Sequence, residues 1–502
     1  MANYIGIDLG TTFSAVATLD ETGRAVIVHN QEGENLTPSV VSFLEGDHVD
    51  VGESARRTLW VDPNTIGRFK RDMGTSEPLP DSYTARGVEH TPTALSALVL
   101  KKLKDDAIKA LQHIEEAVVT IPANFANEAR EATMHAAKLA GLNVKYIINE
   151  PTAAALFYAS KKGEELFGKY AVYDLGGGTF DISIINVSGQ DVEVVATNGA
   201  SKLGGDDFDE VMQKLVGKKF KEATGKEMDL QDYTKNDAED DKKSLSKRDK
   251  CRTVISRQDI EITRNEFEEA ISSLIAQTEM LCESSLDEAD LSAGEIQAVF
   301  LAGGSTRMPC VRESVQKVFE KEPTSTANVD EVVALGAALY AAYKGDRSKL
   351  SAIQKHSVEK IKFSEITSKY YGVISLTGDE AREQQKLANS ILIKKGEKIP
   401  TATSETFFTV HEGQEGVDCR ITECGAPETD PQFVNEIWSG LLELPGGRPA
   451  NQKIEVTFSY DENQIMKCSF LDVESGNNTK VDLEMGAGSA DGEDDIEKFI
   501  VE

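Results

Sequence analysis

Two short stretches of this chain resemble each other. The first is IGIDLGTTFS at Ile5–Ser14, and the second is VYDLGGGTFDIS at Val172–Ser183. Each begins with a strand-like apolar run that leads through an aspartate into glycine and threonine. A matched pair of such loops indicates that an α/β unit is duplicated in the chain. We therefore predict a domain of two similar lobes, each of which contributes one loop.

The pattern of the chain changes at about residue 346. Before that point, strand-like runs such as EEAVVTIP alternate with helical patterns such as NEAREATMHAAKLAGL, which is typical of α/β proteins. Residues 346–366 are polar and rich in lysine. Beyond them, short strand-like runs from KYYGVISL to TKVDLEM are separated by turns such as LPGGRP, which predicts a β-sandwich.

These patterns divide the chain into four predicted segments. They are a two-lobed α/β domain at 1–350, a linker at 351–366, an all-β sandwich at 367–485 and an acidic tail at 486–502. We expect the tail to be mobile, with one short helix in it.

The composition narrows the range of partners and compartments. The net charge of −31 disfavours binding to nucleic acids or to anionic membranes. The six cysteines form no CxxC pair, and nothing completes a zinc site beside Cys419 and Cys424, so we expect reduced thiols. The sequence shows no signal peptide and no apolar run near the roughly 18 residues of a spanning helix. We therefore expect a cytoplasmic protein with no nucleic-acid or membrane partner.

The residue types of the two loops suit a complex of a metal ion with phosphate groups. Glycines let backbone N–H groups approach a triphosphate closely, and threonine hydroxyls add further donors. Aspartates such as Asp8, Asp174 and Asp181 repel phosphate, but they can hold Mg²⁺ through water and orient an attacking water. The alternative is a pair of tight hairpin turns, which the repetition of the pattern disfavours.

A third glycine stretch, VFLAGGSTRMP at Val299–Pro309, offers a place for a flat base. Gly303 and Gly304 follow an apolar strand, and the Arg307 guanidinium could stack on a base brought against the backbone. A plain strand–loop–helix connection is the alternative.

Taken together and in this order, five motifs resemble the DnaK-type heat shock protein 70 family. They are the two Asp-Gly-Thr loops, INEPTAAAL at Ile148–Leu156, LGGDDFD at Leu203–Asp209 and LAGGSTRMP. The resemblance covers about residues 1–485. It implies an actin-like ATPase domain joined by a linker to a β-sandwich that binds extended apolar segments of unfolded proteins. It also implies ATP and ADP, Mg²⁺ and K⁺ as cofactors, and a J-domain co-chaperone and a nucleotide exchange factor as partners.

The resemblance implies roles for individual residues. Lys70, in GRFKRDMG, would face the γ-phosphate and stabilise charge on the transferring group, and Thr179 would contact the same phosphate. Acids that position Mg²⁺, K⁺ and water would be Asp8, Glu150, Asp174 and Asp181, with Asp8 and Asp174 nearest the metal. The phosphate cradle would be Gly10, Thr11, Thr12, Gly176, Gly177 and Gly178. Pro122 and Arg130 would report the nucleotide state to the second domain.

The adenosine and peptide sites are also implied by the resemblance. The adenosine would lie between Glu239, Lys242, Lys243 and Ser246 on one side and Gly303, Gly304, Ser305, Arg307 and Asp330 on the other. Lys243 replaces the usual arginine and loses its planar stacking, so we expect weaker nucleotide binding. The peptide groove would be lined by Val373, Leu376, Phe407, Val410, Val417 and Cys419. The alternative for these six is ordinary sandwich core.

Three departures from the family pattern leave the function open. The linker stretch IKFSE (Ile361–Glu365) has Lys362 and Ser364 where the family has leucines, which weakens its burial. Tyr146 stands where an arginine commonly helps to receive the J-domain, and no helical lid is expected after Met485. The alternative function is an ATP-binding regulatory or co-chaperone partner with weak or no peptide cycling. A small-molecule kinase on the same ATPase fold is a third possibility, which the β-sandwich disfavours.

Overall fold

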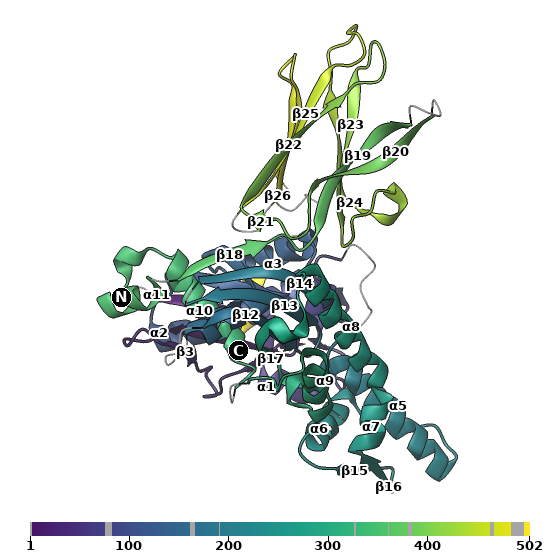
Figure 1. Cartoon of the computed structure of the whole chain (residues 1–502). Coiled ribbons are helices and arrows are strands. Elements are labelled where there is room, and N and C mark those ends of the chain that lie inside the picture. The colour runs from purple at the N-terminus through teal and green to yellow at the C-terminus, as the bar shows by residue number, and fades with distance from the viewer. Residues whose placement is uncertain are drawn as a thin grey trace. The chain divides into compact units, whose positions relative to one another are not determined.

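The computed structural model of the chain describes residues 3–75, 83–160, 166–189, 191–325, 328–359, 361–379, 384–461, 466–482 and 496–502. The chain forms two compact units (Figure 1). Unit 1 comprises Met1–Phe363 and Gly492–Glu502, and unit 2 comprises Ser364–Asp491. Unit 2 is therefore an insertion in unit 1, because the chain belongs to unit 1 both before and after it.

The first large sheet of unit 1 has the strand order β11-β10-β1-β2-β3, and the short β4 also pairs with β2. Strand β1 runs antiparallel to β2 and parallel to β10. The strands are β1 (Tyr4–Asp8), β2 (Phe13–Leu19), β3 (Ala25–Val28), β4 (Thr37–Pro38), β10 (Glu116–Ile121) and β11 (Val144–Asn149). Nearly all of β1 and β2 is buried, which explains their continuous apolar sequence.

The second large sheet repeats this arrangement. Four of its six strands follow the order β17-β12-β13-β14, and β12 runs antiparallel to β13 and parallel to β17. They are β12 (Phe167–Leu175), β13 (Phe180–Ser188), β14 (Asp191–Ala200) and β17 (Ile296–Ala302). The α/β class expected from the sequence is confirmed, and each of the two similar loops joins the central hairpin of one sheet.

Two helices pack between these sheets. Helix α10 (Val332–Lys344) contacts β1, β2 and β10, whereas α4 (Glu150–Ser160) contacts β12 and β13, and the two helices pack on each other. Their contact is very close at Gly336, where an added Cβ would lie 1.7 Å from the carbonyl oxygen of Ala153. The alanine-rich sequences of both helices suit this close contact.

The remaining elements of unit 1 cover the outer faces of the sheets. Helices α2 (Pro92–Leu111) and α3 (Asn127–Leu139) pack together on the side of the first sheet, and α8 (Ser272–Glu288) covers β13 and β14. A smaller sheet has the order β28-β6-β5-β7, formed by β5 (Val40–Phe43), β6 (His48–Val51), β7 (Thr65–Gly67) and β28 (Ile500–Val501). The other elements are α1 (Glu53–Thr58), η1 (Phe69–Asp72), β8 (Thr84–Ala85), β9 (Val88–Glu89), α5 (Gly205–Thr224), α6 (Lys235–Leu245), β15 (Lys250–Ile255), β16 (Gln258–Thr263), α7 (Arg264–Ala270), η3 (Ala293–Glu295), η4 (Gly304–Arg307), α9 (Pro309–Phe319), η5 (Arg347–Lys349) and α11 (Ala352–Val358).

Unit 2 contains two antiparallel four-stranded sheets that share one core. Their orders are β20-β19-β23-β24 and β22-β25-β26-β27. The strands are β19 (Tyr370–Asp379), β20 (Gln384–Ile393), β22 (Thr401–Phe408), β23 (Gly416–Cys424), β24 (Asn435–Glu443), β25 (Lys453–Tyr460), β26 (Met466–Asp472) and β27 (Asn478–Asp482), with η6 (Pro431–Phe433) between β23 and β24. Alternate residues of β25 are buried, and the rings of Tyr371 and Tyr460, from different sheets, lie 5.5 Å apart.

The junction between the units differs from a simple linker. Within the segment expected to be linker, α11 is part of unit 1, because the Gln354 side chain donates to the carbonyl oxygen of Leu19 at 3.1 Å and Val358 is fully buried. Strand β18 (Lys362–Ile366) then leads into unit 2, where Glu365 and Ile366 pair with β21 (Lys398–Ile399). Hydrogen bonding of these short runs cannot be read from local sequence.

The C-terminal residues also differ from the expected mobile tail. Residues 496–502 form η7 (Ile496–Lys498) and β28 and belong to unit 1, whereas residues 486–495 lie outside the described part of the chain. Ile496 is buried in the core of unit 1. The acidic residues before this segment led to the prediction of a mobile tail, because the apolar residues that follow them have packing partners only in the folded unit.

The six cysteines are free thiols. Among the helices in the described ranges, none is both long and apolar enough to cross a membrane.

We predict that Gly336→Ala lowers the free energy of unfolding of unit 1 by about 1–3 kcal/mol, because the added methyl group overpacks the contact between α10 and α4. The sign is informative, since alanine in a helix is normally favoured over glycine by about 1 kcal/mol. Urea unfolding of the full chain measures the change. Gly294→Ala is the control, because the nearest atom to its Cβ would be 3.9 Å away; equal effects of the two variants would contradict the prediction.

Candidate functional site

Unit 1 contains a cavity of about 620 Å³ that collects most of the predicted nucleotide-site residues. It lies where the β1–β2 loop, the β12–β13 loop, α6 and η4 come together. The predicted residues that line it are Asp8, Gly10, Thr11, Thr12, Lys70, Glu150, Asp174, Gly176, Gly177, Thr179, Glu239, Lys242, Lys243, Ser246, Gly303, Gly304, Ser305, Arg307 and Asp330. Gly178, Asp181, Pro122 and Arg130 are not among the lining residues.

The two glycine loops approach each other at the level of the backbone. A Cβ on Gly177 would lie 1.9 Å from the Thr12 hydroxyl oxygen, and one on Gly178 would lie 2.6 Å from a Thr11 methyl group. The Gly10 N–H donates to the Ser14 hydroxyl at 3.1 Å, and the Gly176 N–H donates to the Thr179 carbonyl oxygen at 3.1 Å. The loops therefore present backbone to the cavity where any larger residue would separate them.

Three carboxylates, those of Asp8, Glu150 and Asp174, line the cavity together with Lys70, and the carboxylate of Asp181 is buried near them. The Lys70 ammonium lies 2.5 Å from Glu150 Oε1, and both side chains are almost completely buried. Burial, together with the charge of Glu150, raises the pKa of Asp8 to about 7 and raises the pKa values of Asp174 and Asp181 well above their usual range. A single ammonium cannot balance this set of acids, so the site favours an additional cation.

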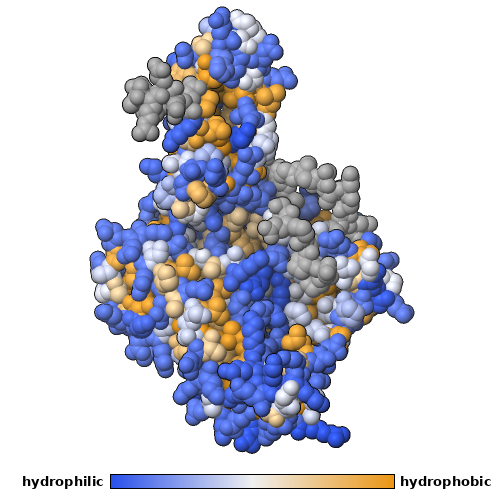
Figure 2. Space-filling model, turned by 90° about the vertical axis from the view of Figure 1, so that its right-hand side faces the viewer, coloured by the Kyte–Doolittle hydropathy of each residue, from blue (hydrophilic) through white to orange (hydrophobic). Residues whose placement is uncertain are grey.

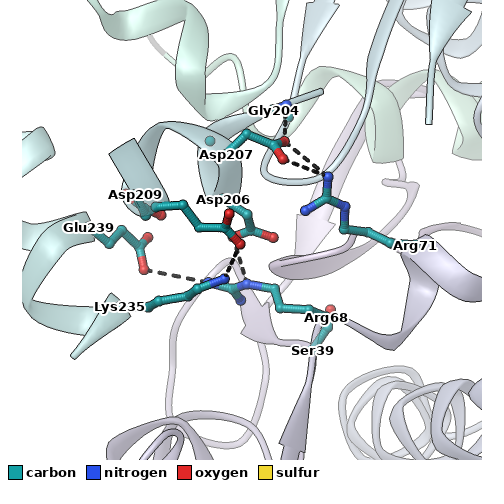
Figure 3. A network of polar contacts seen from close by, with 12 residues as sticks. Ser39, Arg68, Arg71, Gly204, Asp206, Asp207, Asp209, Lys235 and Glu239 are labelled. Atoms are coloured by element: carbon teal, nitrogen blue, oxygen red, sulfur yellow. Dashed lines mark hydrogen bonds and ion pairs between the residues drawn. The ribbon is translucent and has the colours of Figure 1, made fainter. Parts of the chain in front are cut away.

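The segment that carries Lys70 is fixed to the opposite side of the cavity by two arginines (Figure 3). Arg68 Nε lies 2.7 Å from Asp206 Oδ1, and Arg71 Nη2 lies 3.0 Å from both carboxylate oxygens of Asp207. Asp207 also accepts a hydrogen bond from the Gly204 N–H at 2.8 Å. Because Asp206 and Asp207 lie in the first turn of α5, these pairs join the η1 segment to the start of that helix.

The loop after β10 connects the predicted Pro122–Arg130 pair to the acids. The Arg130 side chain is buried and donates to the carbonyl oxygens of Phe125 at 3.0 Å and Ala123 at 3.2 Å. Within this loop, the Asn124 backbone N–H donates to Asp181. The Lys70 ammonium lies 5.8 Å from the centre of the Phe125 ring. A movement of this loop would therefore change the contacts of both the Asp181 carboxylate and the Lys70 ammonium.

Basic residues surround Glu239 on the α6 side of the cavity. Lys243 Nζ lies 2.6 Å from Glu239 and 5.8 Å from the centre of the Phe13 ring. Although burial acts in the opposite direction, Lys243 and Arg68 hold the pKa of Glu239 at about 2. Across the cavity, Arg307 Nη2 lies 2.6 Å from Asp330 Oδ2. The two sides could enclose a polar, flat group between them.

Sequence reasoning missed several residues that line the cavity, namely Phe13, Leu36, Gly205, Asp206, Asp209, Lys247, Met308, Val329 and Val333. Asp206 and Asp209 lie in the LGGDDFD motif, which was the available signal for them. The Asp209 carboxylate binds Lys242 Nζ at 2.6 Å.

The residues that line the cavity fit a nucleoside triphosphate and its bound cations. Thr12 Oγ1 and Asp181 Oδ1 are buried and have no hydrogen-bond partner in the described part of the chain. The glycine backbone and the threonine hydroxyls suit phosphate oxygens, and the excess of carboxylates suits Mg²⁺. No three His, Cys, Asp or Glu side chains in the described ranges are arranged to bind a metal ion directly. Carboxylates such as those of Asp8 and Asp174 can hold Mg²⁺ through water.

The profile of one protein family, described as Hsp70 protein, matches residues 4–502. This chain belongs to the Hsp70 family. Hsp70 proteins bind ATP and ADP with Mg²⁺ and act as ATP-dependent chaperones, which is the general class of this protein. The cavity of this Hsp70 is lined by residue types that suit such a nucleotide.

The predicted peptide-groove residues of this Hsp70 do not share one environment. Val373 and Cys419 are buried in the core of unit 2, and Phe407 and Val417 pack against that core. Leu376 is exposed and Val410 is half-buried. Core packing, the alternative considered from the sequence, therefore describes Val373 and Cys419 better than a groove does.

Tyr146, which stands where the family commonly has an arginine, is half-buried on β11. The Lys344 ammonium of α10 lies 5.2 Å from the centre of its ring. A cation is therefore present at this place on the surface, although it comes from a different element.

We predict that Gly177→Ala weakens ATP binding by about 10- to 100-fold, because its methyl group would push the β12–β13 loop away from Thr12. Gly176→Ala is a matched control one residue away, since the nearest atom to its Cβ would be 3.8 Å distant. Isothermal titration with Mg-ATP measures both affinities, and thermal unfolding verifies that both variants fold. Equal affinities would show that the close approach of the loops does not matter for binding.

Proposed function

We propose that this Hsp70 hydrolyses ATP in unit 1 and uses unit 2, as a β-sandwich, to bind extended apolar segments of unfolded proteins. In this proposal unit 1 is the actin-like ATPase domain of the family. The observation that carries the ATPase proposal is the buried pair of Lys70 and Glu150, which lies with Asp8 and Asp174 in the lining of the cavity and with Asp181 buried nearby. All the residue types that hydrolysis needs are present there.

Each of these residues has a role that follows from its surroundings. Glu150 holds the Lys70 ammonium, which donates to the transferring phosphoryl group and stabilises its charge. The unpaired Oδ1 of Asp181 can accept a hydrogen bond from the attacking water and so orient it. The Thr179 hydroxyl donates to a phosphate oxygen. Mg²⁺, held through water by Asp8 and Asp174, would offset the charge of the phosphate oxygens, and K⁺ would lie among the same acids.

The surface of unit 2 supports the peptide-binding part of the proposal. Large apolar side chains are exposed on its strands and at η6, namely Leu376, Leu387, Phe408, Phe433 and Leu441, and Figure 2 shows apolar areas on unit 2 at the top of the view. Exposed apolar residues on a sheet can bury the side chains of an extended peptide. A J-domain co-chaperone and an exchange factor would be further partners, and the cytoplasmic location stays a prediction.

A second candidate is an ATP-binding regulatory partner that does not cycle peptides. The observation that favours it is the junction residue Lys362, whose side chain is 79% exposed and lies 3.5 Å from Asp191 Oδ2. An apolar residue in its place would be driven to bury itself in an interface, whereas lysine is stable in water. This candidate shares the nucleotide site but lacks strong coupling between nucleotide and peptide.

We predict that Lys70→Ala lowers the rate of single-turnover ATP hydrolysis by about 10²–10³-fold, because it removes the cation that stabilises the transferring phosphoryl group. Lys247→Ala is the control, since Lys247 also lines the cavity but is exposed. Hydrolysis that is too slow to detect in the unmodified chain would favour the regulatory candidate. A rate that is measurable but equal in both variants would contradict the role of Lys70.

We also predict that the double substitution Lys362→Leu and Ser364→Leu increases the stimulation of ATP hydrolysis by an apolar peptide, because it restores apolar residues that can be buried at the junction. The measurement is the ratio of steady-state ATPase rates with and without the peptide. Lys355→Leu, in α11, is a control for the added apolar surface. An unchanged ratio would show that the polar junction does not limit coupling.

A further inference from the structure

Residues 496–502, here called the return segment, extend the small sheet of unit 1. Strand β28 runs parallel to β6, with Ile500 beside His48 and Val501 beside Val49. The N–H of Ile500 donates to the carbonyl oxygen of Asp47 at 2.8 Å, and the N–H of Glu502 donates to that of Val49 at 2.9 Å. The return segment therefore pairs with the edge strand β6 through its backbone, at the end of the chain that lies in unit 1 (Figure 1).

Two apolar side chains anchor the return segment. Ile496 is 2% exposed and belongs to the core that includes the residues of β5, β6 and α2. The Phe499 ring lies 5.6 Å from Phe43 in an edge-on orientation, and Phe43 stacks on His90 at 4.0 Å. This geometry is that of a favourable aromatic cluster.

Polar contacts at Phe499 and at Glu502 add to these anchors. Lys101 Nζ, on α2, donates to the carbonyl oxygen of Phe499 at 2.7 Å. His48 Nδ1 lies 2.7 Å from Glu502 Oε1. Backbone pairing to an edge strand, combined with pockets for spaced apolar side chains, is the recognition mode of β-strand addition. The surface formed by β6, Phe43, His90 and Lys101 is here called the seat.

We propose that the seat is a peptide-binding site of unit 1, that its occupant is the chain's own return segment, and that this occupancy anchors unit 2 at a second point. Unit 2 is already joined to unit 1 by the chain through Phe363 and Ser364. The connection from Asp482 to Ile496 can span at most about 50 Å when fully extended. With the seat occupied, unit 2 therefore lies in a loop of the chain that is closed by the non-covalent contacts of the return segment, rather than on one linker.

The second anchor changes how far unit 2 can move away from unit 1. A domain on a single linker explores a volume set by that linker, whereas closing a loop removes the distant part of that volume. Unit 2 stays near unit 1 even when the polar junction around Lys362 contributes little binding. This consequence depends on the seat alone and does not require ATP hydrolysis.

The first experiment tests the seat in the full chain, with a protease site placed within residues 486–491. The probe is a fluorescein-labelled synthetic peptide with the sequence of residues 493–502, and anisotropy reports its binding. After cleavage and exchange of the released segment, we expect saturable binding that is at least about tenfold tighter than to the uncleaved chain, where the tethered segment competes. Equal binding to both chains, or none to the cleaved chain, would overturn the proposal.

Variants of this probe and of the chain identify the contact. A probe with Phe499→Ala should bind at least about tenfold more weakly, because it lacks an aromatic anchor, whereas Glu497→Ala alters an exposed side chain and should leave binding unchanged. Lys101→Met in the chain should also weaken binding of the probe, because it removes the donor to the Phe499 carbonyl oxygen. The proposal would be overturned if probe binding were unchanged by Phe499→Ala and Lys101→Met but weakened by Phe408→Ala in unit 2, because the peptide would then bind to unit 2.

The second experiment tests the anchor with the intact full-length Phe499→Asp variant. We expect hydrogen exchange at the Ile500 and Glu502 amides to accelerate at least about tenfold, and the radius of gyration from X-ray scattering to increase. Glu497→Ala should change neither, and unchanged ATP binding verifies that unit 1 is folded. Faster exchange without an increase in radius would overturn the anchoring role, and unchanged exchange would overturn the seat.

Discussion

In unit 1, the β12–β13 loop approaches the β1–β2 loop so closely that a Cβ on Gly177 would lie 1.9 Å from the Thr12 hydroxyl oxygen. This contact sets the shape of the cavity that the two loops line. Each loop joins the hairpin at the centre of one large sheet, and α4 and α10 pack between those sheets. The separation of the two loops therefore depends on how closely these helices pack, including the contact of Gly336 with Ala153. Small residues at both levels allow the two halves of the unit to meet.

The electrostatics of the cavity depend on the same convergence. Buried acids repel one another. Burial is the largest cause that raises the pKa of Asp8 to about 7, and the negative charge of Glu150 is the second. Lys70 offsets part of this charge, and Arg68 and Arg71 fix its segment to the start of α5. The remaining excess of negative charge supplies the attraction for cations.

Unit 2 is connected to unit 1 at both of its ends, which distinguishes this Hsp70 from a chain with a single junction. After β27, the described residues form only η7 and β28, and both belong to unit 1. The polar junction residue Lys362 is exposed and paired with Asp191, so that it offers little apolar surface. A second connection through the return segment would maintain proximity where the first contributes little binding energy.

The sequence by itself determined the α/β class and the glycine, threonine and aspartate residues of the duplicated loops, because those patterns suit the backbone conformation and phosphate chemistry. Lys70, Glu150 and the α6 residues of the cavity were predicted only through the resemblance to the family. The sequence also predicted most strands of unit 2 from their alternating apolar residues. It did not predict strands β20 and β24, which complete the first sheet of unit 2 by pairing with β19 and β23. It also could not distinguish core residues from groove residues at Val373 and Cys419, because the burial of a strand residue depends on the sheet that faces it. Only the tertiary structure decided that Ile496 and Phe499 have partners. Those partners lie on β5 and α2, which are distant in sequence, and no local pattern encodes a contact between segments that meet only after folding.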